Sequence, residues 1–401
     1  MKKKRLKYAA VLLMSVILID GCSSKSAGSY YKEGLDYFNS GNYEKAEASL
    51  SQALKINGER ADYYIDYAMT KIQLGKYEDA IQYFDRAILD KDNSIVNKNN
   101  KSAYRGKGIA YYKSHNYNKA IEQFEKALAV DALRDLNMDI LYYKADSQAK
   151  AGLFDKAVKT YTDILKEKPS DAYIYYSRAY AYRMQGSYDK SLADYDKAIK
   201  LAGSNYDYYF GKYFLLIEKD DKDGAAAVLD MAANIKGTTQ EDNFNLAKVH
   251  YYMGDYENAL VEFSDAFRNG FAEAYFFLGS IYEQKEDYKN AVNNYNMYIN
   301  EEANITSAAV YNQIAFCEIK LKNYEEALSY IQTGLKYNDI AYNRYLQRNQ
   351  IVVYENMGDF ENAYTLMKDY LAAYPEDEDA QAESEFLGTR LPESSTPHKE
   401  K

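Results

Sequence analysis

Residues able to do chemistry are few and far apart in this sequence. The cysteines are Cys22 and Cys317, and the histidines are His115, His250 and His398. Two cysteines cannot build a disulfide framework, and no histidine pair has the spacing of a helical metal site. The chain contains no G-x-S-x-G, P-loop or H-E-x-x-H motif, and no cysteine stands near a histidine. We therefore expect no enzyme, no metal and no cofactor, and Cys317 is expected to be a buried, inert thiol.

Cys22 stands at the end of a separate N-terminal segment. Residues 2–7 carry five Lys or Arg, and an apolar stretch follows over residues 8–19. That stretch is too short to cross about 30 Å of hydrocarbon, but it suits the apolar region of a secretory signal. The letters IDGC that end the segment resemble a bacterial lipobox. The resemblance implies that the Cys22 thiol receives a diacylglyceryl group before cleavage ahead of it, although Asp20 departs from the usual small, uncharged residue.

The segment predicts where the mature chain resides. We expect a lipoprotein signal peptide over residues 1–21 and a flexible tether over residues 22–29. Two acyl chains hold a protein stably at a membrane, so the remaining chain would lie outside the cytoplasm, anchored in a bacterial cell envelope. Two alternatives stay open: an uncleaved anchor beside an incidental Cys22 thiol, or cleavage after Ala27 without lipid.

A hexamer beginning with "GNYEKA" at Gly41 recurs along the whole remaining chain. Nine near copies can be read directly, and the spacing of the others places a tenth, "DDKDGA", where one is missing. The hexamers end at Ala46, Ala80, Ala120, Ala157, Ser191, Ala225, Ala259, Ala291, Ala327 and Ala363. A period of about 34 residues over ten copies is typical of a stack of helix–turn–helix units.

Each hexamer begins one helix and ends another. Apolar residues stand four and seven places after its last residue, as with Leu50 and Ala53 after Ala46, which is the spacing of one helical face. A small residue, such as Gly108, stands twelve places before the last residue in eight copies and would let two helices approach closely. The leading Gly of six copies is expected to adopt a left-handed conformation, and the following Asn, Asp or Ser can cap the second helix.

This pattern resembles the tetratricopeptide repeat, a pair of antiparallel helices. Tyr takes the place of the family's usual Trp, while Pro169 and Pro375 fall on its closing proline position. The resemblance covers about residues 30–375 and implies an all-α fold, a right-handed α-solenoid of about ten stacked units. Residues 376–401 are expected to add an acidic capping helix and a disordered tail.

The resemblance also implies a binding surface. Ligands of this family usually lie in a concave groove lined by the first helix of each unit. Carried onto this sequence, the groove would be lined by Tyr142, Tyr173, Tyr176, Tyr180, Arg183, Phe210, Phe214, Phe244 and Tyr251. Tyrosine offers a wide apolar face and one hydroxyl, which suits a binding surface. The alternative is that these side chains only pack between neighbouring first helices.

We expect a scaffold that binds a protein or peptide partner. The alternative is a carbohydrate- or other ligand-binding surface lipoprotein, although the long inserted loops and Trp platforms of glycan receptors are missing. A chaperone-tail adaptor is not expected, because the family's Lys and Asn clamp positions hold Tyr31, Leu35, Asp66, Ser102 and Gly106. A net charge of −10 argues against a nucleic-acid partner.

Overall fold

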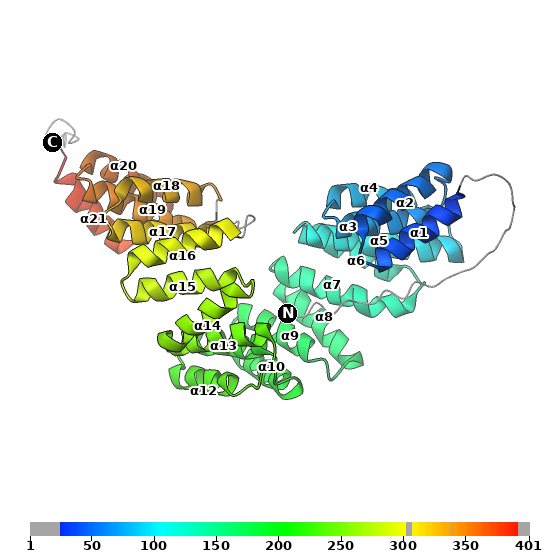
Figure 1. The fold of residues 1–401 in the computed structure, drawn as a ribbon, viewed down its shortest axis with the longest axis horizontal. Helices are drawn as coiled ribbons and strands as arrows, with labels where there is room; N and C mark the ends of the chain where they lie inside the picture. Colours follow the sequence, from blue (N-terminus) through cyan, green and yellow to red (C-terminus); the bar gives the residue numbers. More distant parts are fainter. Residues whose placement is uncertain (1–24, 302–306, 338, 392–401) are drawn as a thin grey trace. The chain divides into compact units, whose positions relative to one another are not determined.

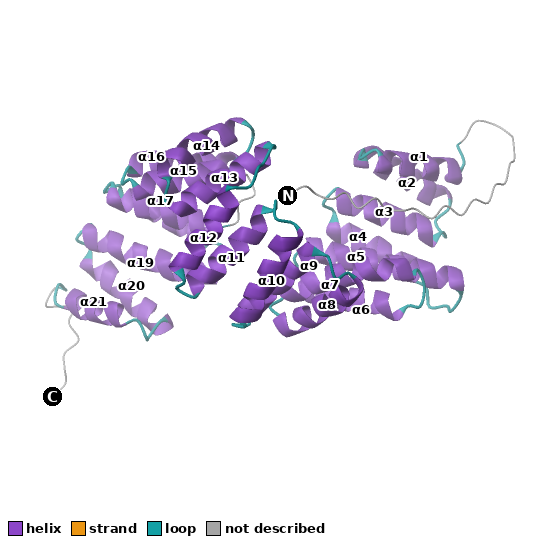
Figure 2. Ribbon diagram, turned by 90° about the horizontal axis from the view of Figure 1, so that it is seen from below, coloured by secondary structure: helices purple, strands orange, loops and turns teal. Residues whose placement is uncertain are grey.

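The computed structural model describes residues 25–301, 307–337 and 339–391 of the chain. The described residues form helices, turns and loops, without a strand (Figure 2). The chain divides into two compact units that meet in sequence at Val228 and Leu229. This division falls inside the sixth copy of the repeat, where the sequence predicted one uninterrupted array.

Successive helices pair as the hexamers predicted, with odd-numbered helices first and even-numbered helices second in each repeat (Figure 1). The first unit holds α1 (Ala27–Asn39), α2 (Tyr43–Ile56), α3 (Ala61–Gln73), α4 (Tyr77–Ala87), α5 (Ser94–Lys113), α6 (Tyr117–Ala129), the 3₁₀ helix η1 (Arg134–Leu136), α7 (Asn137–Lys150), α8 (Phe154–Glu167), α9 (Ala172–Met184), α10 (Tyr188–Leu201) and α11 (Tyr206–Glu218). The boundary lies within α12 (Lys222–Ala233). The second unit continues with α13 (Gln240–Met253), α14 (Tyr256–Arg268), α15 (Glu273–Gln284), α16 (Tyr288–Glu301), α17 (Ala308–Lys320), α18 (Tyr324–Leu335), α19 (Ile340–Asn356), α20 (Phe360–Ala373) and α21 (Glu378–Gly388).

The hexamer forms the turn inside every repeat. Its first residue is left-handed in all ten copies, with φ between 56° and 79°. The next N–H donates to the carbonyl five residues back at 2.8–2.9 Å, which is the long bond of a Schellman motif. Six copies use Gly there as predicted, whereas His115, Asp220, Glu286 and Lys322 adopt the same conformation against the preference of their side chains.

The predicted caps form in most, but not all, of the second helices. A side-chain oxygen of the second hexamer residue accepts a backbone N–H bond at Asn42, Asn116, Asp221, Asp255, Asp287 and Asp359. Ser187 and Asn323 were expected to do the same but make no such side-chain bond. At Asn323 the side chain instead donates to the Glu318 carboxylate across the turn, at 2.7 Å.

The core consists of the predicted stripe on each second helix. The last residues of the ten hexamers are at most 1% exposed, and the residues four places on are at most 2% exposed. These side chains pack on a small residue of the first helix. A Cβ atom added to Gly108 on α5 would lie 2.5 Å from a ring carbon of Phe124 on α6, so the two helices pack at a distance that only glycine permits.

The repeats differ in length at the junction that follows a second helix and in the first helix after it. The junction from α4 to α5 spans residues 88–93, and Asn93 caps a helix α5 that is longer than its counterparts. The junction from α6 to α7 holds η1, and the buried Lys101 of α5 contacts the residues on both sides of η1. The Lys101 ammonium donates to the Val130 carbonyl at 3.1 Å and to the Asn137 side chain, and burial lowers its pKa.

At the two ends of the described chain, the helices can be compared with the predicted boundaries of the tether and the capping helix. Helix α1 begins at Ala27, because the Ser26 side chain caps it by accepting from the Ser29 N–H. The predicted tether over residues 22–29 therefore contains the first residues of a helix. At the other end α21 forms the predicted acidic capping helix, with Ala380 and Leu387 fully buried. The predicted signal peptide and most of the predicted tail lie outside the described residues.

Candidate partner-binding site

The first unit exposes an apolar stripe on α9. Tyr173, Tyr180 and Met184 are 44%, 41% and 48% exposed, and their spacing places them on one helical face. Ile217 on α11 is 46% exposed and lies one residue before Glu218, which pairs with Arg183 of α9. We call these four residues the α9 surface. Most apolar side chains of this size are buried elsewhere in the unit, so the α9 surface is a candidate for contact with a partner.

Polar contacts between neighbouring first helices hold the α9 surface in place. The Tyr142 hydroxyl on α7 donates to Asp171, the residue that caps α9, at 2.6 Å. On the other side, the Arg183 guanidinium of α9 contacts the Glu218 carboxylate of α11 at 2.6 Å. The ring of Tyr176 lies 5.2 Å from that of Tyr208, so ring packing adds a second link between α9 and α11.

The predicted groove residues of the first unit take different places. Tyr173 and Tyr180 are exposed, while Tyr142, Tyr176, Arg183 and Phe214 are half-buried. Burial raises the pKa of Tyr176 to about 12. Arg183, expected to orient an acidic group of a ligand, already has Glu218 as its partner.

Two predicted groove residues belong to the core instead. Phe210 on α11 is 6% exposed and stacks with Tyr206 at a centroid distance of 6.4 Å. Phe244 on α13 is 5% exposed and stacks with Phe271 at 5.0 Å. Both were assigned to the groove by resemblance to the family, but other aromatic rings pack against them, so neither offers a surface to a ligand.

The last predicted residue lies in the second unit. Tyr251 on α13 is half-buried, and its hydroxyl is 2.7 Å from that of Ser280 on α15. This contact joins two successive first helices. Tyr251 therefore has a packing role in the second unit, and its predicted part in binding remains a prediction.

Sequence analysis did not single out Met184 and Ile217. Met184 extends the spacing of Tyr173 and Tyr180 by one more turn of α9, and Ile217 follows Phe214 on α11 by three residues. The helical period could have found both. The pattern that indicated a groove consisted mainly of aromatic residues, whereas Met184 and Ile217 are aliphatic.

The described thiol and imidazoles do not assemble a reactive centre. Cys317 is fully buried on α17, and burial raises its pKa well above the usual thiol range. Nδ1 of His115 contacts the Tyr117 hydroxyl at 2.8 Å, and Nδ1 of His250 contacts the Glu262 carboxylate at 2.7 Å. His398 lies outside the described residues. The two described histidines belong to different units.

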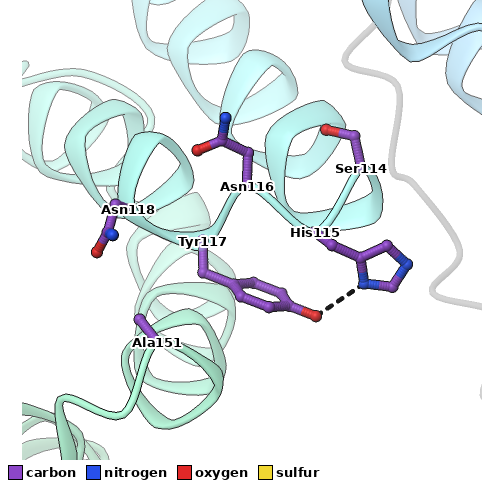
Figure 3. Close-up of a pocket in the computed structure, with 6 residues that line it drawn as sticks. All are labelled: Ser114, His115, Asn116, Tyr117, Asn118 and Ala151. Carbon is purple, nitrogen blue, oxygen red and sulfur yellow. Dashed lines mark hydrogen bonds between the residues drawn. The ribbon is translucent and has the colours of Figure 1, made fainter. Parts of the chain in front are cut away.

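A shallow depression of about 310 Å³ lies at one of the turns (Figure 3). It is lined by Ser114, His115, Asn116, Tyr117, Asn118 and Ala151. Five of these residues belong to the turn between α5 and α6 and to the start of α6. The depression contains none of the predicted groove residues, and its polar lining follows from the turn that every repeat shares.

The fold and the exposed first-helix surface define a class of protein, a stack of helix pairs without a reactive centre in the described residues. Models of the tetratricopeptide repeat match residues 27–60, 59–132, 105–172, 142–207, 244–304 and 308–339, which is more than half of the chain. The chain belongs to the tetratricopeptide repeat family. The crystal structure of yeast Tom70 has the same fold, with a TM-score of 0.52 and 16% identity over 91% of this chain and 89% of that one.

Curated relatives match parts of the chain. The Hsp70-Hsp90 organizing protein of Triticum aestivum is 28% identical over 172 residues, which is 35% of this chain and 29% of that protein. A TPR repeat-containing protein of Methanocaldococcus jannaschii is 31% identical over 147 residues, or 36% of this chain and 25% of that protein. This chain therefore spans less than a third of the length of either relative.

The membrane anchor predicted at Cys22 lies outside the described residues. Among the described helices, none combines the length and the apolar character needed to cross a bilayer.

Proposed function

We propose that this chain is a membrane-anchored scaffold outside the cytoplasm, which binds a protein or peptide partner through the α9 surface. The observation that carries the proposal is the exposure of Tyr173, Tyr180 and Met184 on one face of α9, together with exposed Ile217 on the neighbouring helix α11. Tyrosine and methionine are enriched where proteins meet, and the other described tyrosines of the first unit are half-buried or buried. The name of the wheat relative, an organizing protein for Hsp70 and Hsp90, supports partner binding as the kind of activity.

We do not propose that this chain binds the partners named for the wheat relative. Two positions that would hold a carboxylate clamp, Tyr31 and Asp66, are bonded to each other between α1 and α3. A carboxylate there would repel the acidic end of a chaperone tail. We therefore propose a partner held by apolar contact on α9.

The anchor is proposed from sequence. The basic residues 2–7, the apolar residues 8–19 and the letters IDGC before and at Cys22 support a lipoprotein signal. Lipid at Cys22 would place the repeats beside the membrane of a bacterial cell envelope.

Site-specific crosslinking tests the binding surface. A photo-reactive amino acid is placed in the full chain at Tyr180 or at Ile217, and at Val261 of α14 as a control that is 65% exposed. We expect both test positions to give an adduct of one mass with the same protein, identified by mass spectrometry, and Val261 to give none. Adducts of equal yield at all three positions, or none at Tyr180 and Ile217, would contradict the proposal.

A further inference from the structure

Three repeats of the first unit converge on one carboxylate. Asp146 of α7 accepts a hydrogen bond from the Tyr161 hydroxyl of α8 at 2.7 Å and another from the Tyr173 hydroxyl of α9 at 3.0 Å. Tyr161 is 1% exposed, so it holds the carboxylate from the core, whereas Tyr173 holds it from the solvent side. Tyr112 of α5 is close enough that the charge of Asp146, after burial, raises its pKa.

Several other acids on the first helices of the unit are paired with a cation, although Asp66 of α3, like Asp146, accepts a bond from a phenol. Asp139 is paired with Arg105, and Glu218 is paired with Arg183. No Lys or Arg of the described residues lies within ion-pair distance of Asp146. The nearest along its helix, Lys150, has its ammonium 6.0 Å from the ring centre of Tyr117. Burial raises the pKa of Asp146, although both phenol bonds and the charge of Lys150 oppose that rise.

The surroundings of Asp146 suit a cation better than any other group. A carboxylate offers about four acceptor positions, and the two phenols occupy two of them. The ring of Tyr173 is 44% exposed beside it, and a cation is attracted to the face of such a ring. An ammonium or guanidinium group would gain a charge-assisted hydrogen bond and a ring contact at the same place. An anion would instead be repelled by the negative charge of Asp146.

We propose that Asp146 and Tyr173 bind a cationic side chain, a lysine or arginine carried by an extended segment of the partner. This inference rests on the proposed function, because the same segment would lay its apolar residues along Tyr180 and Met184 of α9. The cation would be the fixed point of the complex and the α9 surface would be its apolar neighbour. The partner segment is thus basic and apolar, in contrast to the acidic chain that binds it.

The test uses the full chain and two labelled peptides, followed by fluorescence anisotropy. One peptide has the sequence GLSKSLG, and the other carries the neutral norleucine in place of its lysine. We expect the lysine peptide to bind at least tenfold more tightly. Asp146→Asn should reduce this preference to about onefold. Its amide oxygen can accept the bond from one phenol, and its NH2 group can donate to the oxygen of the other. Its melting temperature serves as the check that it folds.

Asp66→Asn is the matched control for net charge. Asp66 also accepts a phenol bond, from Tyr31, but it lies two repeats away, on α3. The lysine preference should survive in this variant. Equal affinity for both peptides, no binding of either at millimolar concentration, or a preference that persists in Asp146→Asn would overturn the inference. Crosslinking at Tyr180 separates the two proposals, since a captured partner without lysine preference would leave the proposed function standing.

Discussion

The Tyr31 hydroxyl of α1 donates a hydrogen bond to the Asp66 carboxylate of α3, and the ring of Tyr31 stacks on that of Tyr63 at 4.2 Å. The bond joins the first helices of two successive repeats. The bond from Tyr31 lowers the pKa of Asp66, but desolvation has the larger and opposite effect. The pKa of Asp66 is therefore raised to about 6. The folded chain therefore holds a proton on Asp66 at a pH where an unfolded aspartate, with a pKa of about 3.9, has lost it.

We expect this proton to make stability depend on pH. Between about pH 4 and pH 6 the folded state binds more protons than the unfolded state, so the free energy of unfolding falls as the pH rises. Asp66→Asn removes the ionisation but still accepts from Tyr31. The variant should be more stable than the parent at pH 7.5, by up to about 3 kcal/mol, and the gain should vanish near pH 4. Urea unfolding at both pH values measures it.

Asp194→Asn provides the contrast. The Asp194 carboxylate is bound by both ends of the Arg178 guanidinium, at 2.7 and 2.9 Å, so its loss should destabilise the chain at pH 7.5. A destabilised Asp66→Asn at pH 7.5 would show that the charged carboxylate is favourable in the fold.

The close packing of α5 on α6 gives a second prediction. Gly108→Ala would place a Cβ 2.5 Å from the fully buried ring of Phe124, and the ring cannot move away without disturbing the core. We expect a loss of about 1–3 kcal/mol, typical of overpacking. Gly28→Ala on α1 is the control, because its new Cβ would meet no atom closer than 3.9 Å. That change should stabilise the helix or leave it unchanged, and similar losses in both variants would refute the packing argument.

The turns that lack glycine give a third prediction. Lys322 has φ of 64° and an exposed side chain, so Lys322→Gly should relieve a strained backbone without removing a contact. The expected gain in the free energy of unfolding is about 1 kcal/mol. Gly358→Lys, at the equivalent place of the next repeat, should lose a similar amount, since Gly358 has φ of 76°. Chemical denaturation of both variants checks the sign, and a loss in Lys322→Gly would mean that the side chain contributes more than the backbone strain costs.

The anchor gives a fourth prediction. Cys22→Ala removes the only cysteine in the N-terminal segment, and therefore the only thiol there that a lipid could modify. The variant should leave the membrane fraction or accumulate as uncleaved precursor, as shown by fractionation and by mass. Cys317→Ala is the control, because its buried thiol should not affect either property. Normal processing and retention of Cys22→Ala would exclude lipid attachment.

The repeat could be predicted from sequence, because the same helical spacing of apolar residues and the same turn recur ten times. Ala46, Leu50 and their equivalents recur at a helical spacing, and each is buried as expected. The left-handed turn could be predicted where Gly occupies it. At Lys322 and Glu286 the composition gives no sign of it, and only the position within the hexamer does.

The candidate site could be predicted only in part. Tyr173 and Tyr180 follow from the period of α9, but the burial of Phe210 depends on which neighbouring rings cover it. The bond between Tyr173 and Asp146 joins residues that are 27 positions apart on different helices. Its formation depends on how two repeats stack, which the period of either helix does not determine.

The repeats differ in length after their second helices but not at the ten Schellman turns, and this difference has a genetic consequence. Residues 88–93 are largely exposed and precede a helix that begins with its own cap at Asn93. Added codons at this point would lengthen a surface connection and leave the ten Schellman turns unaltered. A reporter domain spliced between Asp90 and Lys91 should therefore leave the repeats folded. The same insertion between Gly41 and Asn42 would separate the two groups that close a turn. Insertions in the gene should thus be tolerated at the junctions after second helices but not at the Schellman turns inside the repeats. These two kinds of position alternate along the sequence.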